Sequence, residues 1–291
     1  MTSILEDPTK MYPRAEPQQQ ARPGSSARMH PRPDYGEATY QGSGKLLNRK
    51  ALITGADSGI GRAVALAFAR EGADVVISYL NEDEDARETE RLVTDAGRKA
   101  VLAPGDISNE AQCKNLIERT VRELGGIDIL VNNAAFQATH ESLQDFSTEE
   151  WELTFRTNMT AMFWLCKYAE PHLQPGSTVV NTASINSFKP KSTLLAYAST
   201  KGAIQAFTKA LGELWAEKGI RVNAVAPGPV WTPLIPSTMP VEQVAEFGAN
   251  TPLKRPAQPA ELAPVYVLLA SKDSSYITSQ IYGVTGGTVL A

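Results

Sequence analysis

Two side chains that could move a proton stand four residues apart in the run Tyr197-Ala198-Ser199-Thr200-Lys201. If this segment is helical, Tyr197 and Lys201 share one face, with Cβ atoms about 5–6 Å apart. A phenol has an ordinary pKa of about 10, and a neighbouring ammonium would lower that pKa toward neutral pH. Such a pair is often no more than two exposed helical residues. It becomes a candidate for acid–base catalysis because Ser184 lies 13 residues earlier, at the end of an expected strand.

The stretch from Lys50 to Arg62 is a second candidate, since a short apolar run is followed by three glycines and an alanine-rich segment. Strand, glycine turn and helix in this order form the first half of a dinucleotide-binding βαβ unit, in which helix N–H groups face a pyrophosphate. The spacing G-x-x-x-G-x-G also occurs in turns that bind nothing. The residues expected at the dinucleotide are Gly55, Asp57, Ser58, Gly59, Ile60 and Gly61.

The elements that must position these residues alternate along the chain. Strands are expected at 51–54, 74–79, 99–103, 127–132, 178–183, 221–226 and 281–284, and helices at 60–71, 82–96, 110–124, 148–173, 194–218 and 260–270. Ser147 and Glu150 predict a capping box for the fourth helix. Alternating helices and apolar strands indicate an α/β fold, a doubly wound parallel sheet of about seven strands. Residues 46–291 are therefore expected to form one Rossmann-type domain.

In such a sheet, ligands bind beyond the carboxyl ends of the strands. Asp106 could accept a hydrogen bond from an adenine amino group, and the small side chains after the fourth strand would let a flat ring pass. The further residues expected at the cofactor are Tyr79, Asp106, Ile107, Asn132, Ala134, Ala135, Pro227, Gly228, Val230 and Thr232, with Tyr197 and Lys201. The substrate is expected among residues 136–140, 185–188 and 231–251. Within them, His140 is either a substrate contact or a solvated loop residue.

Composition indicates an ordinary enzyme-sized, cytoplasmic protein of 291 residues with 42% hydrophobic residues and a net charge of −4. This mild charge suggests neither nucleic acid nor an anionic membrane as a partner, and no apolar run approaches the roughly 20 residues of a membrane span. The two cysteines, Cys113 and Cys166, are expected in the core. The three histidines are scattered and predict no metal site.

The first 45 residues differ from the rest of the chain, because they are rich in proline and glutamine and lack hydrophobic periodicity. They contain no long apolar run and several acids, so neither a secretory signal nor a transit peptide is expected. Two interpretations remain open. The segment is either a flexible tail or an arm that docks on the body or on a neighbouring subunit through Met11, Tyr12, Tyr35 and Tyr40.

Taken together, the motifs resemble the short-chain dehydrogenase/reductase family over residues 50–291. They are Thr54-Gly55-x-x-x-Gly59-Ile60-Gly61, Asn132-Asn133-Ala134, Ser184, Tyr197-x-x-x-Lys201 and Pro227-Gly228. The long N-terminal segment, together with Gly125-Gly126-Ile127-Asp128 and the run from Gln258 to Ala263, resembles the bacterial branch described as glucose/ribitol-dehydrogenase-like or aldehyde-reducing. The resemblance implies a seven-stranded Rossmann sheet, usually a homotetramer, and NAD(P)-dependent hydride transfer to or from a small alcohol, sugar, aldehyde or ketone.

The resemblance also implies a catalytic set of Asn158, Ser184, Tyr197 and Lys201, in which Asn158 fixes a water that links Lys201 to solvent. Lys201 would in addition hold the nicotinamide ribose. Ala135 departs from the glycine that the family commonly has, and its methyl group would narrow the nicotinamide side of the cleft. The rival interpretation is a non-catalytic dinucleotide-binding regulatory or scaffold protein on the same fold, against which the intact set argues.

The choice between NAD and NADP depends on the end of the second strand. An acid there would bind the ribose 2′-hydroxyl of NAD, and Arg or Lys would bind the 2′-phosphate of NADP. The run Ser78-Tyr79-Leu80-Asn81 has neither. Asp57 and the acidic run from Glu82 to Asp85 would disfavour a phosphate. We therefore expect the protein to use both cofactors, with a modest preference for NAD.

Overall fold

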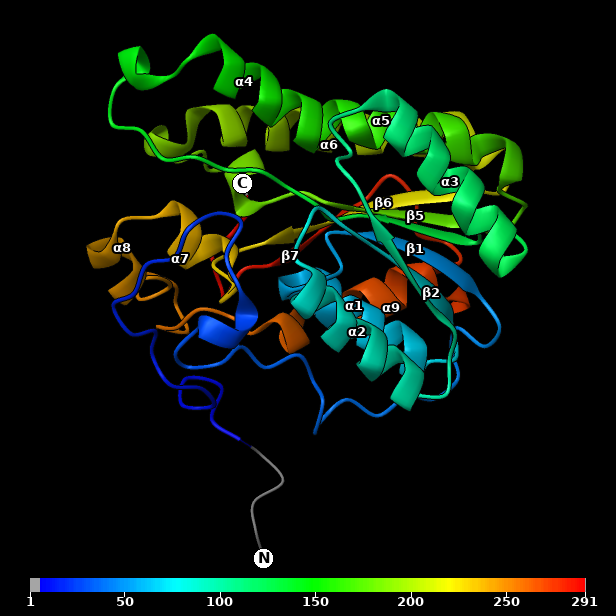
Figure 1. Cartoon of the computed structure of the whole chain (residues 1–291), viewed down its shortest axis with the longest axis horizontal. Helices are drawn as coiled ribbons and strands as arrows, with labels where there is room; N and C mark the ends of the chain where they lie inside the picture. The colour runs from blue at the N-terminus through cyan, green and yellow to red at the C-terminus, as the bar shows by residue number, and fades with distance from the viewer. Residues whose placement is uncertain (1–5, 291) are drawn as a thin grey trace, which may run out of the picture.

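The framework of the protein is a seven-stranded parallel sheet, seen in a computed structural model that describes residues 6–290 (Figure 1). The strands are β1 (Lys50–Thr54), β2 (Asp74–Tyr79), β3 (Ala100–Pro104), β4 (Ile129–Asn132), β5 (Thr178–Thr182), β6 (Arg221–Pro227) and β7 (Ile281–Val284). Their order is β3-β2-β1-β4-β5-β6-β7, and all neighbours are parallel. The predicted fold class is confirmed. The winding reverses between β1 and β4, where such sheets bind ligands.

Helices cover both faces of this sheet (Figure 1). On one face lie α1 (Gly59–Arg70), α2 (Asp83–Asp95) and α9 (Pro259–Ala270), and on the other α3 (Glu110–Leu124), α4 (Thr148–Phe155), α5 (Ala161–Ala169) and α6 (Leu195–Ala216). Adjacent strand residues serve opposite cores, so Ile53 packs toward α1 and α9 whereas Leu52 packs toward α3 and α5. Within residues 6–290, none of the helices is long and apolar enough to cross a membrane.

The main difference from the predicted elements lies in the expected helix at 148–173. It is interrupted by a π-helical turn at Arg156–Thr160, between α4 and α5, and this turn contains Asn158. Such turns are frequent at functional sites. The capping box is only half correct, because Ser147 Oγ accepts from Glu150 N at 3.1 Å, whereas the Glu150 carboxylate meets His140 Nε2 at 2.6 Å. The other strands and main helices end within two residues of their predicted bounds.

Residues 6–45 run along the body of the protein (Figure 1), and the first five residues of the expected arm lie outside the described residues. The indole Nε1 of Trp231 donates to the carbonyl of Pro31 at 2.7 Å. Met29 is fully buried in a small apolar cluster with Trp231 and Ile235. This segment therefore covers the short helices α7 (Leu234–Thr238) and α8 (Val241–Ala245), which follow β6.

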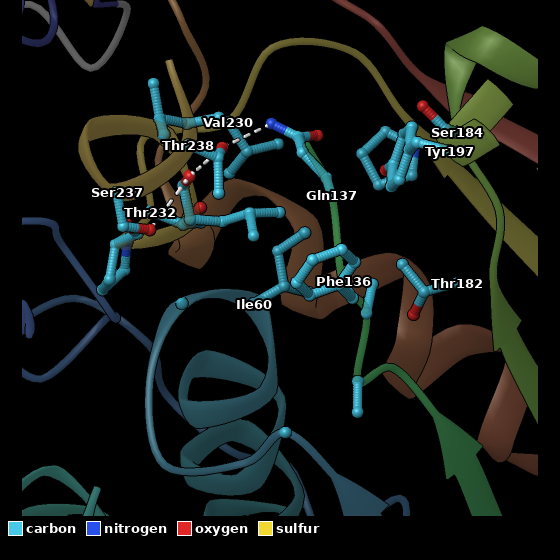
Figure 2. A pocket seen from close by; sticks show the side chains of 18 of the residues that line it. Ile60, Phe136, Gln137, Thr182, Ser184, Tyr197, Val230, Thr232, Ser237 and Thr238 are labelled. Carbon is cyan, nitrogen blue, oxygen red and sulfur yellow. Dashed lines mark hydrogen bonds between the residues drawn. The ribbon is translucent and has the colours of Figure 1, made fainter. Parts of the chain in front are cut away.

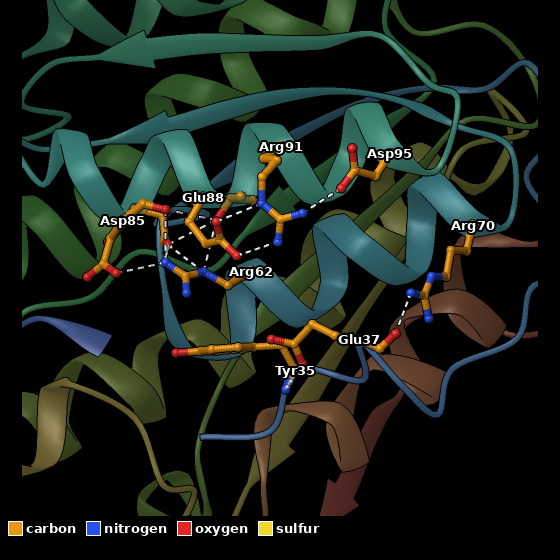
Figure 3. Close-up of polar contacts among 10 residues, drawn as sticks. Tyr35, Glu37, Arg62, Arg70, Asp85, Glu88, Arg91 and Asp95 are labelled. Atoms are coloured by element: carbon orange, nitrogen blue, oxygen red, sulfur yellow. Dashed lines mark hydrogen bonds and ion pairs between the residues drawn. The ribbon is translucent and has the colours of Figure 1, made fainter. Parts of the chain in front are cut away.

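A buried arginine, Arg62 in α1, joins this N-terminal segment to the glycine turn (Figure 3). Its guanidinium pairs with Asp85 Oδ1 at 2.8 Å and donates to the carbonyl of Asp57 at 2.9 Å through Nε. The Tyr35 ring lies against it, 4.6 Å from the guanidinium carbon, and Ser26 N donates to the second Asp85 oxygen at 2.9 Å. A buried charge is strongly destabilising when a partner is lost, so the contacts of Arg62 and Asp85 hold the N-terminal segment, the glycine turn and α2 in place against one another.

Candidate active site

A cleft of about 1020 Å³ runs along the carboxyl edge of the sheet. One part is lined by the glycine turn from Gly55 to Ile60, and another by Ser184 and Tyr197. Small-molecule and cofactor sites span roughly 300–1,000 Å³, so this cleft has room for a large cofactor beside a small substrate.

Most residues expected at the site line this cleft. They are Gly55, Asp57, Ser58, Gly59, Ile60, Tyr79, Asp106, Ile107, Ala134, Ala135, Ser184, Tyr197, Lys201, Pro227, Gly228, Val230 and Thr232. Gly61, Asn132 and Asn158 lie behind its wall. A Cβ on Gly61 would stand 2.0 Å from the Gly55 carbonyl oxygen, so this glycine is needed to close the turn. The Asn132 amide donates to Asn181 Oδ1 at 2.9 Å and joins β4 to β5 instead of facing a ligand.

The glycine turn has the shape and charge that a dinucleotide needs. Gly55 and Gly59 have φ values of +61° and +53°, which residues with a Cβ rarely adopt. A Cβ on Gly59 would come within 3.1 Å of the Thr232 side chain. The first turn of α1 leaves free N–H groups there, and the helix dipole favours an anion. The residues present therefore fit a nicotinamide dinucleotide, with its diphosphate at the start of α1.

The three candidate catalytic side chains come from two elements. Ser184 follows β5, and Tyr197 and Lys201 lie in the first turns of α6. The side chains of Ser184 and Tyr197 lie together beside the cleft (Figure 2). The predicted shared helix face is found, since Lys201 Nζ is 5.3 Å from the centre of the Tyr197 ring. Lys201 is 2% exposed, and its ammonium donates to the carbonyl of Thr182 at 2.6 Å. This bond fixes α6 against the end of β5.

Burial governs the acid–base properties of this pair. Desolvation raises the pKa of Tyr197 to about 12, with a smaller opposing effect from hydrogen bonding to Ser184. Desolvation also lowers the pKa of Lys201 to about 7. Each shift favours the neutral form of its group. The lowering of the Tyr197 pKa that the spacing predicted is therefore not found, because both groups are removed from water.

Asn158 acts on main chain rather than on the cleft itself. Its Oδ1 accepts from Phe136 N at 2.7 Å, and its Nδ2 donates to the carbonyl of Phe136 at 2.9 Å and to Thr200 Oγ1 at 3.1 Å. These bonds join the segment after β4 to α6, and the role of Asn158 in holding a water stays a prediction. Asn158 thus positions the wall of the cleft beside Tyr197.

Gln137 lies within the range 136–140 that was expected near the substrate, although its contact was not predicted, and Arg22 was not expected at the site. Gln137 spans part of the cleft and donates from Nε2 to Thr238 Oγ1 at 2.7 Å (Figure 2). Arg22 of the N-terminal segment lines the cleft, with its guanidinium carbon 5.2 Å from the centre of the Phe136 ring. The partner of Gln137 and the place of Arg22 depend on the packing of segments that are far apart in the sequence.

Two residues expected near the substrate lie elsewhere. His140 pairs with Glu150, and Trp231 is turned toward the N-terminal segment. Cys113 and Cys166 are both buried and free. Among residues 6–290, no group of three or more His, Cys, Asp and Glu side chains could hold a metal ion.

Comparisons with known proteins agree with this geometry. A family model described as enoyl-(acyl carrier protein) reductase matches residues 55–289. The chain is 44% identical to glucose and ribitol dehydrogenase of Daucus carota, covering 94% of this chain and 96% of that protein. It is 43% identical to the chloroplastic NADPH-dependent aldehyde reductase 1 of Arabidopsis thaliana, covering 94% and 97%.

Among solved structures, a short-chain dehydrogenase from Burkholderia cenocepacia J2315 in complex with NADP superposes with a TM-score of 0.79. It is 27% identical, and the match covers 84% of this chain and 98% of that one. The chain therefore belongs to the short-chain dehydrogenase/reductase family, as an NAD(P)-dependent oxidoreductase that transfers a hydride between a nicotinamide dinucleotide and the CH–OH or carbonyl group of a small alcohol, sugar, aldehyde or ketone.

Proposed function

We propose that Tyr197 exchanges the proton with the substrate oxygen, while Ser184 donates a hydrogen bond that orients this oxygen. The observation that supports this proposal is the meeting of Ser184 and Tyr197 beside a cleft whose other part is a glycine turn. When bound, the nicotinamide dinucleotide supplies or accepts the hydride. The protein contributes position, a dry surrounding and the proton.

Lys201 holds the nicotinamide ribose and passes the proton onward. Its pKa of about 7 lets the amine change charge near neutral pH, which a proton relay requires. Asn158 supports the relay from behind, by holding Phe136 and Thr200 in place. The remaining expected contacts, from Gly55 through Thr232, bind the dinucleotide along the cleft.

The experiment that tests this assignment follows nicotinamide absorbance in the presence of a panel of small aldehydes, ketones and sugars. We expect turnover with several of them, and its loss in a variant that lacks the Tyr197 hydroxyl. Absence of turnover with the whole panel, under conditions where the protein binds the dinucleotide, would support the scaffold interpretation instead.

For the cofactor we propose dual use with a modest preference for NAD. Tyr79 ends β2 and donates to Asp83 Oδ1 at 2.7 Å, and Asp57 and Glu82 line the same part of the cleft. These acids would repel a 2′-phosphate, whereas Arg22, which also lines the cleft, would attract one. Titration of both cofactors decides the matter, and NADP binding that is tenfold tighter than NAD would contradict the preference.

We further propose a cytoplasmic homotetramer in which residues 1–45 form an arm separate from the catalytic domain at 46–291. Exposed apolar side chains on one helical layer support an interface between subunits. They are Trp151, Leu153, Phe163, Leu195 and Leu214. The contacts of Met29 and Pro31 with Trp231 support an arm rather than a tail. Light scattering on the full chain tests the assembly.

A further inference from the structure

Gln137 is a buried amide whose orientation is set by its neighbours. It is 3% exposed and lines the cleft. The Thr238 hydroxyl donates its only proton to the carbonyl of Leu234, so toward Gln137 it must accept. The group that meets Thr238 Oγ1 at 2.7 Å is therefore the Gln137 NH₂, and the amide oxygen is left on the other side.

That oxygen points into the cleft, toward the side where Ser184 and Tyr197 lie (Figure 2). Among residues 6–290, no donor contacts it. Water can serve the oxygen while the cleft is open. A substrate that expels this water must bring its own donor, because burying a carbonyl oxygen without a hydrogen-bond partner is unfavourable.

We infer that the Gln137 amide oxygen accepts a hydrogen bond from a hydroxyl group of the substrate, so that the preferred substrates are hydroxylated aldehydes and the corresponding polyols. This inference rests on the proposed function, since Tyr197 and Ser184 must hold the reacting oxygen. The Gln137 amide oxygen then accepts a hydrogen bond from a second oxygen of the same substrate molecule. A site built around such a bond discriminates strongly against an analogue without the hydroxyl, because the amide is then left unpaired.

Other polar side chains that line the cleft could also bind hydroxyl groups. Asn186 and Lys191 follow β5 and line the cleft, as does Gln243 of α8. Lys191 Nζ donates to Gln243 Oε1 at 3.0 Å, so polar groups of two segments that line the cleft meet. The carboxamide of a bound nicotinamide is a second group that could donate to the Gln137 amide oxygen. The experiment distinguishes this donor from a hydroxyl group of the substrate.

The experiment compares glyceraldehyde with propanal, which have the same carbon chain with and without hydroxyl groups. We expect the parent protein to show a higher kcat/KM for glyceraldehyde. Gln137→Met keeps the length of the side chain and removes the acceptor, and it should lower the glyceraldehyde-to-propanal ratio of kcat/KM by about 10–100-fold. The matched control is Thr139→Val, which removes the 3.0 Å bond from Thr139 Oγ1 to the carbonyl of Thr238 but no group of the cleft. It should leave the ratio unchanged.

Three outcomes would overturn the inference. Turnover of both aldehydes with an unchanged ratio in Gln137→Met would leave the proposed function standing and remove the role of the amide. Equal losses for both aldehydes, with a raised KM for the cofactor, would assign the donor to the nicotinamide carboxamide. Turnover of neither aldehyde by a parent protein that turns over other members of the panel would overturn the inference alone, whereas absence of turnover with the whole panel would remove the proposed function as well.

A measurement on the parent protein alone keeps the test valid if Gln137→Met does not fold. Propanal, 2-hydroxypropanal and 3-hydroxypropanal differ by one hydroxyl at known positions. The inference requires at least one hydroxylated member to exceed propanal tenfold or more in kcat/KM. Equal values for all three would overturn it.

Discussion

Replacing Tyr197 by Phe removes one oxygen and keeps the ring, so it isolates the proton transfer from the packing of the cleft. General acid–base catalysis contributes about 10²–10⁴-fold, which corresponds to roughly 3–5 kcal/mol of transition-state stabilisation. In this structure Lys201 is held by the carbonyl of Thr182, not by the phenol, and Ser184 remains in place. We therefore expect a loss in kcat at or beyond the upper end of that range, with cofactor affinity within threefold of the parent.

A second tyrosine offers a matched control for this variant. Tyr266 is fully buried, and its hydroxyl forms a 2.8 Å hydrogen bond with Thr182 Oγ1. Tyr266→Phe should lower the free energy of unfolding by about 1–2 kcal/mol, because the bond is lost in the core. Turnover should stay within threefold. Tyr197→Phe should show the reverse pattern, with lost turnover and nearly unchanged stability.

The assay is steady-state turnover by nicotinamide absorbance, combined with cofactor titration and urea unfolding of each variant. Turnover of a folded Tyr197→Phe within threefold of the parent would mean that another group handles the proton, and would refute the assignment. Equal losses of turnover in the two variants would show that the cleft responds to packing and not to the chemistry of the phenol.

Three further perturbations test the structure away from the phenol. The pKa of Lys201 is lowered from an ordinary 10.5 to about 7, so the unfolded chain binds more protons within this window and the stability of the parent rises with pH across it. Lys201→Met should therefore raise the free energy of unfolding most near pH 6 and least near pH 10, and an equal gain at both, by urea titration, would contradict the shift. Arg62→Met leaves the buried carboxylate of Asp85 unpaired and should cost about 3–5 kcal/mol by urea unfolding, partly restored by Asp85→Leu, and a loss below 1 kcal/mol would argue against the role of this pair. Deletion of residues 1–44 uncovers Trp231 and should lower the Tm or the assembled mass, whereas no change in calorimetry or light scattering would identify a tail.

Much of this protein follows from short stretches of its sequence. The strand at Ala51–Ile53, the glycines after it and the helix that follows are local patterns, because periodicity and turn geometry depend on near neighbours. Parallel strands place their carboxyl ends at one edge, so Ser184 and the glycine turn were predicted to share a cleft. The spacing of Tyr197 and Lys201 likewise follows from helix geometry alone.

Tertiary structure decided what these residues experience. Desolvation depends on every segment packed around a group. It raises the pKa of Tyr197, whereas a neighbouring ammonium alone would lower it, and it lowers the pKa of Lys201. The π-helical turn directs the Asn158 side chain toward the main chain of Phe136, and this turn was not predicted from the sequence. The orientation of the Gln137 amide depends on a hydroxyl 101 residues away. Contacts between segments so far apart arise only when the whole chain packs, which is why the sequence predicted most residues of the cleft but not the hydrogen bonds and burial that set their chemistry.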